Sequence, residues 1–124
     1  MSLELTPELF DVYRTTARQR HEKEQRERAR REARAWVLAR RAAGLLKERF
    51  GAARVVVFGS LVHDGLFTLW SDVDIAAWGL QPQDTLQAIG AVFDLDADIQ
   101  INLADVNTVS VELLSAIERE GVGL

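Results

Sequence analysis

Two aspartates separated by one residue, Asp72 and Asp74, are the side chains in this sequence best placed to do chemistry. They alternate with Val73 and Ile75. Because successive side chains of a β-strand point to opposite faces, both carboxylates are expected on one face of a strand. Neighbouring carboxylates repel each other, so the pair predicts a cation bound between them.

An apolar, β-branched run, Val55–Phe58, precedes the aspartates and ends at Gly59 and Ser60. The run predicts a buried strand, and the two small residues predict a sharp turn into a helix. A helix N-terminus offers unpaired N–H groups and a partial positive charge, so Gly59 and Ser60 form a candidate phosphate site. The sequence therefore places a candidate phosphate site and a candidate cation site at neighbouring strand ends.

A third acid, Asp98, stands at the start of the segment 98–102. Ile99 and Ile101 alternate there with polar residues, which predicts a third strand that opens with Asp98. The candidate site thus gains a possible third carboxylate from a separate strand.

Composition limits the kind of protein that carries these residues. The chain has 124 residues, 48% of them apolar, which predicts one domain with a modest core. It has no cysteine, which excludes a disulfide framework and a thiolate zinc site. No segment approaches the ~20 consecutive apolar residues of a membrane span, and the N-terminus lacks the apolar core of a signal peptide. A cytoplasmic protein is expected.

Charge is distributed unevenly along the chain, although the net charge is only −4. Residues 1–50 contain 13 Lys or Arg against 8 Asp or Glu, whereas residues 51–124 contain 2 against 11. The acidic half is better suited to binding metal ions than nucleic acid. The basic half either faces an acidic partner or is simply solvated.

A helix is expected to begin at Thr6 and Pro7, which suit the N-cap and the first helical position. Gly51 offers a C-terminal cap. One continuous helix between these ends would be about 66 Å long, at 1.5 Å per residue. A break near residues 14–20 is the alternative.

The two halves of this helical segment differ in character. The stretch 18–34 is almost wholly charged residues, Gln and Ala, whereas apolar residues from Trp36 to Phe50 recur at helical spacing. We therefore divide the chain into a projecting, charged helical extension, residues 1–35, and a domain, residues 36–124. The extension is expected to project into solvent or to pack on another chain, so a homo-oligomer formed through it is one possibility.

Two further helices are expected after the aspartates, near residues 82–93 and 111–120, because apolar residues repeat there at helical spacing. Helices and strands therefore alternate along the chain. This order predicts an α/β (α+β) fold, in which a small mixed three-stranded sheet carries helices packed mainly on one face, plus the long N-terminal helix.

The Gly59-Ser60 pair, an eleven-residue spacer, Asp72-Val73-Asp74 and Asp98 together resemble the signature of the polymerase-beta-like nucleotidyltransferases. The resemblance covers residues 36–124. Because the chain is short and ends in a segment like that of the family, it is most similar to the minimal nucleotidyltransferases (MNT). These are the antitoxin components of HEPN/MNT toxin–antitoxin pairs.

The resemblance implies a role for each motif residue. Asp72, Asp74 and Asp98 would be catalytic and would hold a pair of Mg²⁺ ions, which prefer oxygen ligands. Gly59 and Ser60 would bind the phosphates of ATP. The implied activity is transfer of AMP from ATP to a hydroxyl, namely a tyrosine of a HEPN-domain toxin, with no covalent enzyme intermediate.

One departure from the family pattern bears on activity. The family commonly carries arginine just after the Gly-Ser pair, but Leu61–Asp64 contains none, and His63 is the nearest substitute. The alternative to an enzyme is a catalytically degenerate binding module that neutralises a partner by contact through the long helix. A third reading is transfer to a small molecule of the aminoglycoside type. RNA binding through the basic helix is the least expected.

The three tryptophans have different expected roles. Trp36 is expected in the core. Trp70 and Trp78 flank the acidic strand, where either could stack a base, although packing in the core or at its rim is the expected role.

Overall fold

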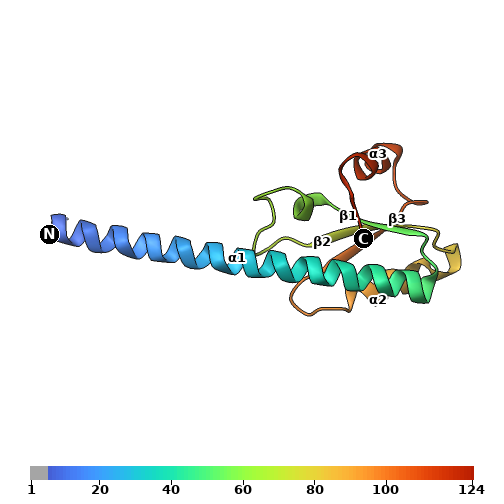
Figure 1. Cartoon of the computed structure of the whole chain (residues 1–124), viewed down its shortest axis with the longest axis horizontal. Helices are drawn as coiled ribbons and strands as arrows, with labels where there is room; N and C mark the ends of the chain where they lie inside the picture. Colours follow the sequence, from blue (N-terminus) through green and yellow to red (C-terminus); the bar gives the residue numbers. More distant parts are fainter. Residues whose placement is uncertain (1–5) are drawn as a thin grey trace.

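A computed structural model describes residues 6–124 of the chain, and Figure 1 shows a long helix beside a small sheet. Along the chain, the elements are α1 (Pro7–Phe50), β1 (Arg54–Phe58), the 3₁₀ turn η1 (Gly59–Val62), β2 (Val73–Trp78), the 3₁₀ turn η2 (Pro82–Asp84), α2 (Thr85–Phe93), β3 (Ile101–Asp105), α3 (Val111–Glu120) and β4 (Val122–Gly123). The predicted α+β class is confirmed.

The sheet is mixed, with the strand order β3-β2-β1-β4. β1 runs antiparallel to both β2 and β4, whereas β2 and β3 are parallel. The expected count of three strands was one short, because the two-residue strand β4 pairs with β1. So short a strand carries too few residues to show a period of two in the sequence.

The third strand also starts later than the sequence predicted. The segment 98–102 was expected to form it, but β3 begins at Ile101 and ends at Asp105, so Asp98 lies in the preceding loop. Ile99 and Ile101 are both buried, as their alternation predicted. The alternation of apolar and polar residues in the sequence therefore identified the buried side chains correctly, but it placed the strand too early in the chain.

Helix α1 is continuous, with both of its predicted caps. The Thr6 hydroxyl accepts a hydrogen bond from the N–H of Leu9 at 3.1 Å. At the other end, Gly51 has a φ of 69° and its N–H bonds the carbonyl of Leu46. That left-handed conformation is one that glycine adopts without strain, so the helix ends there.

Helices α1 and α2 cover one face of the sheet and α3 covers the other (Figure 1). On α1, small side chains allow the helix to approach the strands closely, and the buried set is Ala35, Leu38, Ala39, Ala42, Ala43, Leu46 and Phe50. Trp36 is only partly buried against this core. On the opposite face, Ile117 of α3 packs on Val56 and Ala76.

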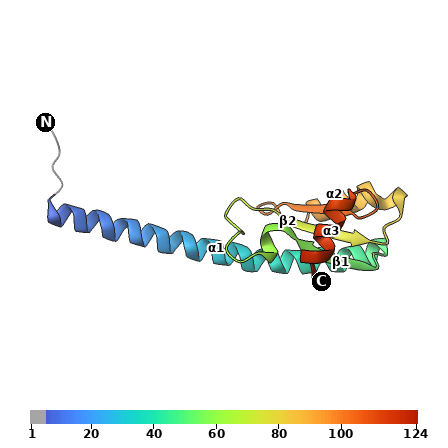
Figure 2. The same ribbon diagram turned by 90° about the horizontal axis from the view of Figure 1, so that it is seen from above.

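The N-terminal half of α1 extends beyond the sheet (Figure 2). Residues 6–26 are all exposed, and burial begins at Glu27 and Arg28. Arg28 donates a hydrogen bond to the carbonyl of Gly65 at 2.9 Å, so the helix meets the domain about two turns before residue 36, where we divided the chain. None of the helices in residues 6–124 has a stretch long and apolar enough to cross a membrane.

Candidate functional site

Gly59 and Asp74 lie against each other where β1 ends. Phe58, the last residue of β1, pairs with Asp74 of β2, and the chain turns at Gly59 with a φ of 77°. A Cβ atom on Gly59 would lie 2.7 Å from Oδ2 of Asp74, closer than real contacts allow. Only glycine satisfies both the backbone angle and the space that the carboxylate needs.

Asp74 is held by two side-chain amides, one on β3 and one just before it. The side-chain N–H of Asn102 donates to Oδ1 of Asp74 at 3.2 Å, and Gln100 donates to the Asn102 carbonyl at 2.7 Å. Burial raises the pKa of Asp74, the hydrogen bond from Asn102 opposes this effect, and the charge of Asp72 raises the pKa further. Keeping both carboxylates ionised therefore costs free energy in the folded protein.

Asp98 does not join this pair. Its side chain is 73% exposed and pairs with Arg34 at 3.6 Å. The residue that pairs with Asp74 across the β2–β3 ladder is Asn102. Among residues 6–124, no three His, Cys, Asp or Glu side chains cluster closely enough to hold a metal ion.

The turn after β1 is shorter than the sequence predicted. Gly59 and Ser60 were expected to begin a helix, but they begin a single 3₁₀ turn that ends at Val62. A turn of four residues sums few peptide dipoles, so any bound phosphate depends on the local backbone instead. His63 points elsewhere, because its Nε2 lies 3.5 Å from the carboxylate of Glu120.

A groove of about 680 Å³ opens beside Asp72. Its walls bring together the N-terminal helix, the segment before β2 and the segment before β3, and its lining includes Arg30, Arg31, Arg34, Trp70, Asp72 and Asp98. The sequence did not reveal these arginines as neighbours of the aspartates, because they lie about forty residues earlier in the chain. Their only sequence signal was the excess of positive charge in the first fifty residues.

Asp96 fixes one wall of this groove. Its carboxylate pairs with Arg34 and accepts hydrogen bonds from the backbone N–H groups of Asp98 and Ile99 at 3.0 and 2.9 Å. Burial acts to raise the pKa of Asp96, but these N–H groups and the Arg34 guanidinium outweigh it and lower the pKa. Arg31 donates a hydrogen bond to the carbonyl of Ser71 at 3.0 Å, which connects α1 to the segment before β2.

The residues present fit one divalent cation better than two. Two carboxylates, Asp72 and Asp74, are a common protein contribution to a Mg²⁺ site when phosphate oxygens and water complete the shell. Burial and the charge of Asp72 both raise the pKa of Asp74, and a bound cation would oppose both effects. A second ion would need a further acid, and the position facing Asp74 holds the amide Asn102.

Neither a family model nor a curated protein matches the sequence. A solved structure does match: the crystal structure of a mutant of the toxin-antitoxin complex MntA-HpeT contains a chain similar to this one. The two chains superpose with a TM-score of 0.56 at 21% sequence identity, over 68% of this chain and 69% of that chain. At that identity, the similarity shows a shared fold.

Proposed function

We propose that this chain is the antitoxin of a toxin–antitoxin pair and that it acts as a Mg²⁺-dependent nucleotidyltransferase. The antitoxin role is supported by the fold that it shares with a chain of the MntA-HpeT complex. The observation that carries the enzymatic role is the contact between the Gly59 turn and Asp74, with Asp72 beside it. That arrangement places the backbone turn directly against one carboxylate, with the second carboxylate close by.

The proposed reaction is an in-line displacement at the α-phosphorus of ATP. A hydroxyl oxygen of the acceptor forms a new bond to the α-phosphorus and releases its proton to solvent. The bond from the α-phosphorus to the bridging oxygen breaks, and pyrophosphate leaves with the bonding electron pair. Asp72 and Asp74 would hold a Mg²⁺ ion, which would neutralise charge on the phosphates and lower the pKa of the attacking hydroxyl. The Asn102 amide holds the Asp74 carboxylate in position, and Gly59, which has no Cβ, leaves the space that this carboxylate occupies beside the turn.

The acceptor is proposed to be a tyrosine hydroxyl of a HEPN-domain toxin, as the resemblance of the motif implies. Residues 6–124 form one four-stranded sheet with its covering helices, which supports an acceptor supplied by another protein.

A second candidate is an antitoxin that neutralises its partner by contact alone. The amide at position 102 and the outward position of Asp98 favour it, because they leave two carboxylates where the motif implies three. The chain also offers a surface for such a contact. The projecting part of α1 exposes an apolar face that includes Leu9, Val12 and Tyr13, with exposed fractions of 48%, 62% and 70%.

Neutralisation of the toxin in growing cells separates the two candidates. The partner to be used is the product of the neighbouring gene. It is expressed together with the wild-type chain, with an Asp72→Ala, Asp74→Ala double variant, or with a Leu9→Ala, Tyr13→Ala variant. The enzymatic proposal predicts that the aspartate variant fails to restore growth. Restored growth with that variant, together with loss of growth with the helix variant, would establish the contact mechanism. Asp11→Ala is the matched control, since position 11 faces away from Leu9 and Tyr13 on the helix.

A further inference from the structure

We propose that the groove beside Asp72 is a subsite for the base of the nucleotide, with Trp70 as its stacking platform and Arg30 as its cation. This inference rests on the proposed function, because it takes the donor to be a nucleoside triphosphate. It assigns to the N-terminal helix a part in binding the donor.

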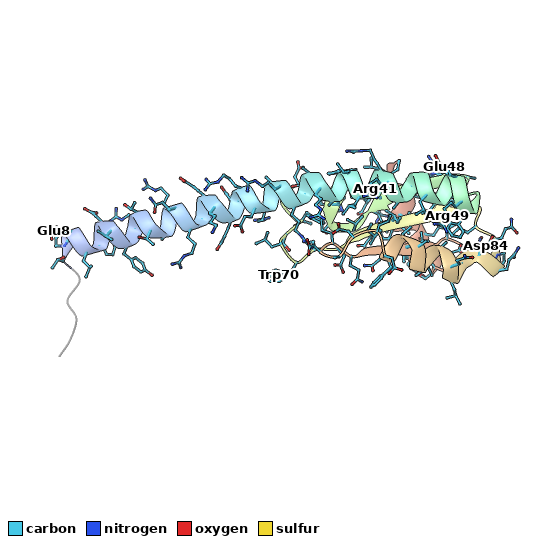
Figure 3. All side chains as sticks on the ribbon, turned by 90° about the horizontal axis from the view of Figure 1, so that it is seen from below. Glu8, Arg41, Glu48, Arg49, Trp70 and Asp84 are labelled. Carbon is cyan, nitrogen blue, oxygen red and sulfur yellow. The ribbon has the colours of Figure 1, made fainter. Side chains whose placement is uncertain are left out.

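Trp70 is placed to meet a ligand instead of supporting the core. Its side chain is 88% exposed, and it lines the groove two residues before Asp72. Figure 3 shows it at the end of the domain from which α1 projects. The other tryptophans differ, because Trp36 packs partly on the core and Trp78 lies under the Arg54 guanidinium, 4.3 Å from the ring centroid.

The three arginines of the groove are not equivalent. Arg31 donates to the carbonyls of Ser71 and Asp98, and Arg34 pairs with Asp96 and Asp98. Both are therefore committed to holding the groove walls. Arg30 is exposed, lines the groove and has no hydrogen bond or ion pair with another side chain in residues 6–124, so it is the guanidinium available to a ligand.

The size and chemistry of the groove favour a nucleotide. Its volume of about 680 Å³ falls within the range of ~300–1,000 Å³ that is usual for small-molecule sites. An aromatic face and a guanidinium together bind a flat base by stacking and by cation–π attraction. Asp72 stands at the same groove, so a base on Trp70 would belong to a nucleotide whose phosphates lie toward the carboxylate pair.

Calorimetric titration of the full chain with ATP, and separately with inorganic tripolyphosphate, tests the subsite without requiring catalysis. Wild type is expected to bind ATP more tightly than tripolyphosphate. Trp70→Ala is expected to weaken ATP binding at least about fivefold, because stacking of one base on an aromatic side chain contributes at least that much to affinity. The variant is also expected to lose the preference for ATP over tripolyphosphate. Arg30→Ala is expected to weaken ATP binding about two- to fivefold.

Arg41→Ala is the matched control, since Arg41 is an exposed arginine of the same helix that does not line the groove. It is expected to bind ATP like wild type. Unchanged ATP affinity in Trp70→Ala, with transfer activity intact, would overturn the subsite and leave the proposed function standing. Loss of toxin binding in Trp70→Ala, with ATP affinity unchanged, would overturn the subsite in favour of a protein contact. Tight, Trp70-dependent ATP binding without any transfer would support the subsite and contradict the proposed function.

Discussion

Gly59 and Asp74 constrain each other, because a single methyl group at position 59 would collide with the carboxylate. Three features of the pair were predictable from sequence: the strand before the turn, the turn itself and the alternation of the aspartates. The collision was not, since it depends on the register that pairs Phe58 with Asp74. Strand register is a tertiary property that no single segment encodes.

Gly59→Ala is expected to lower stability by about 1–2 kcal/mol through the left-handed backbone alone, and to displace Asp74 as well. Gly65→Ala is the control, because Gly65 has a φ of 76° but no atom within 4 Å of an added Cβ. Thermal unfolding with and without Mg²⁺ checks both variants. Retention of a wild-type Mg²⁺ response in Gly59→Ala would show that the contact does not position the carboxylate.

Asn102 occupies the position across the ladder from Asp74, so it controls how many carboxylates the site offers. Asn102→Asp is expected to lower the melting temperature in metal-free buffer, because a third negative charge joins a pair that already repels. Mg²⁺ is then expected to raise the melting temperature by more than it does in wild type. Asn107→Asp, an exposed change beyond β3, is the control. Equal Mg²⁺ responses in the two variants would contradict a metal site at Asp74.

At the scale of elements, the sequence predicted helix α1 with its caps but not its contacts. The i,i+4 spacing of Glu24 with Arg28 and of Glu27 with Arg31 favours ion pairs within a helix. In the structure the two arginines donate to the carbonyls of Gly65 and Ser71 in the loop before β2. A loop carbonyl offers a fixed acceptor that an exposed helix pair does not, so tertiary contact takes precedence over local spacing.

The loop between α2 and β3 is anchored through Asp96. Asp96→Ala is expected to lower the free energy of unfolding at neutral pH by about 0.5–2 kcal/mol, by analogy with the loss of a helix N-cap, whose side chain likewise accepts hydrogen bonds from backbone N–H groups. The folded state lowers the pKa of Asp96, so its stabilisation is present above the ordinary pKa of about 4. It is lost as the pH falls through the lowered value.

Denaturant unfolding of wild type and Asp96→Ala from pH 7 to pH 2 measures this difference. The difference in free energy of unfolding between wild type and Asp96→Ala is expected to disappear below about pH 4. Asp94→Ala, at an exposed position two residues earlier, is expected to show little change at any pH. A constant gap across the range would show that the Asp96 charge contributes nothing to the anchor.

At the scale of the whole molecule, the long helix makes up most of the basic half of the chain and packs on the acidic half. Its C-terminal half covers the sheet, and its N-terminal half extends beyond it (Figure 2). Its middle supplies arginines to the groove, and its N-terminal half exposes an apolar face. The division of the chain at residues 35 and 36 remains a prediction. Periodicity located the buried half well, but it could not show that arginines of the charged half reach the domain, since such contacts have no periodic signature.

Transfer of label from α-³²P-ATP to the partner toxin, in the presence of Mg²⁺, tests the central claim most directly. Wild type and Asp94→Ala are expected to label the toxin, and the Asp72→Ala, Asp74→Ala double variant is expected to leave it unlabelled. Pyrophosphate should appear in equal amount to the label. A tight complex of wild-type chain and toxin that never becomes labelled would contradict the account and establish neutralisation by contact.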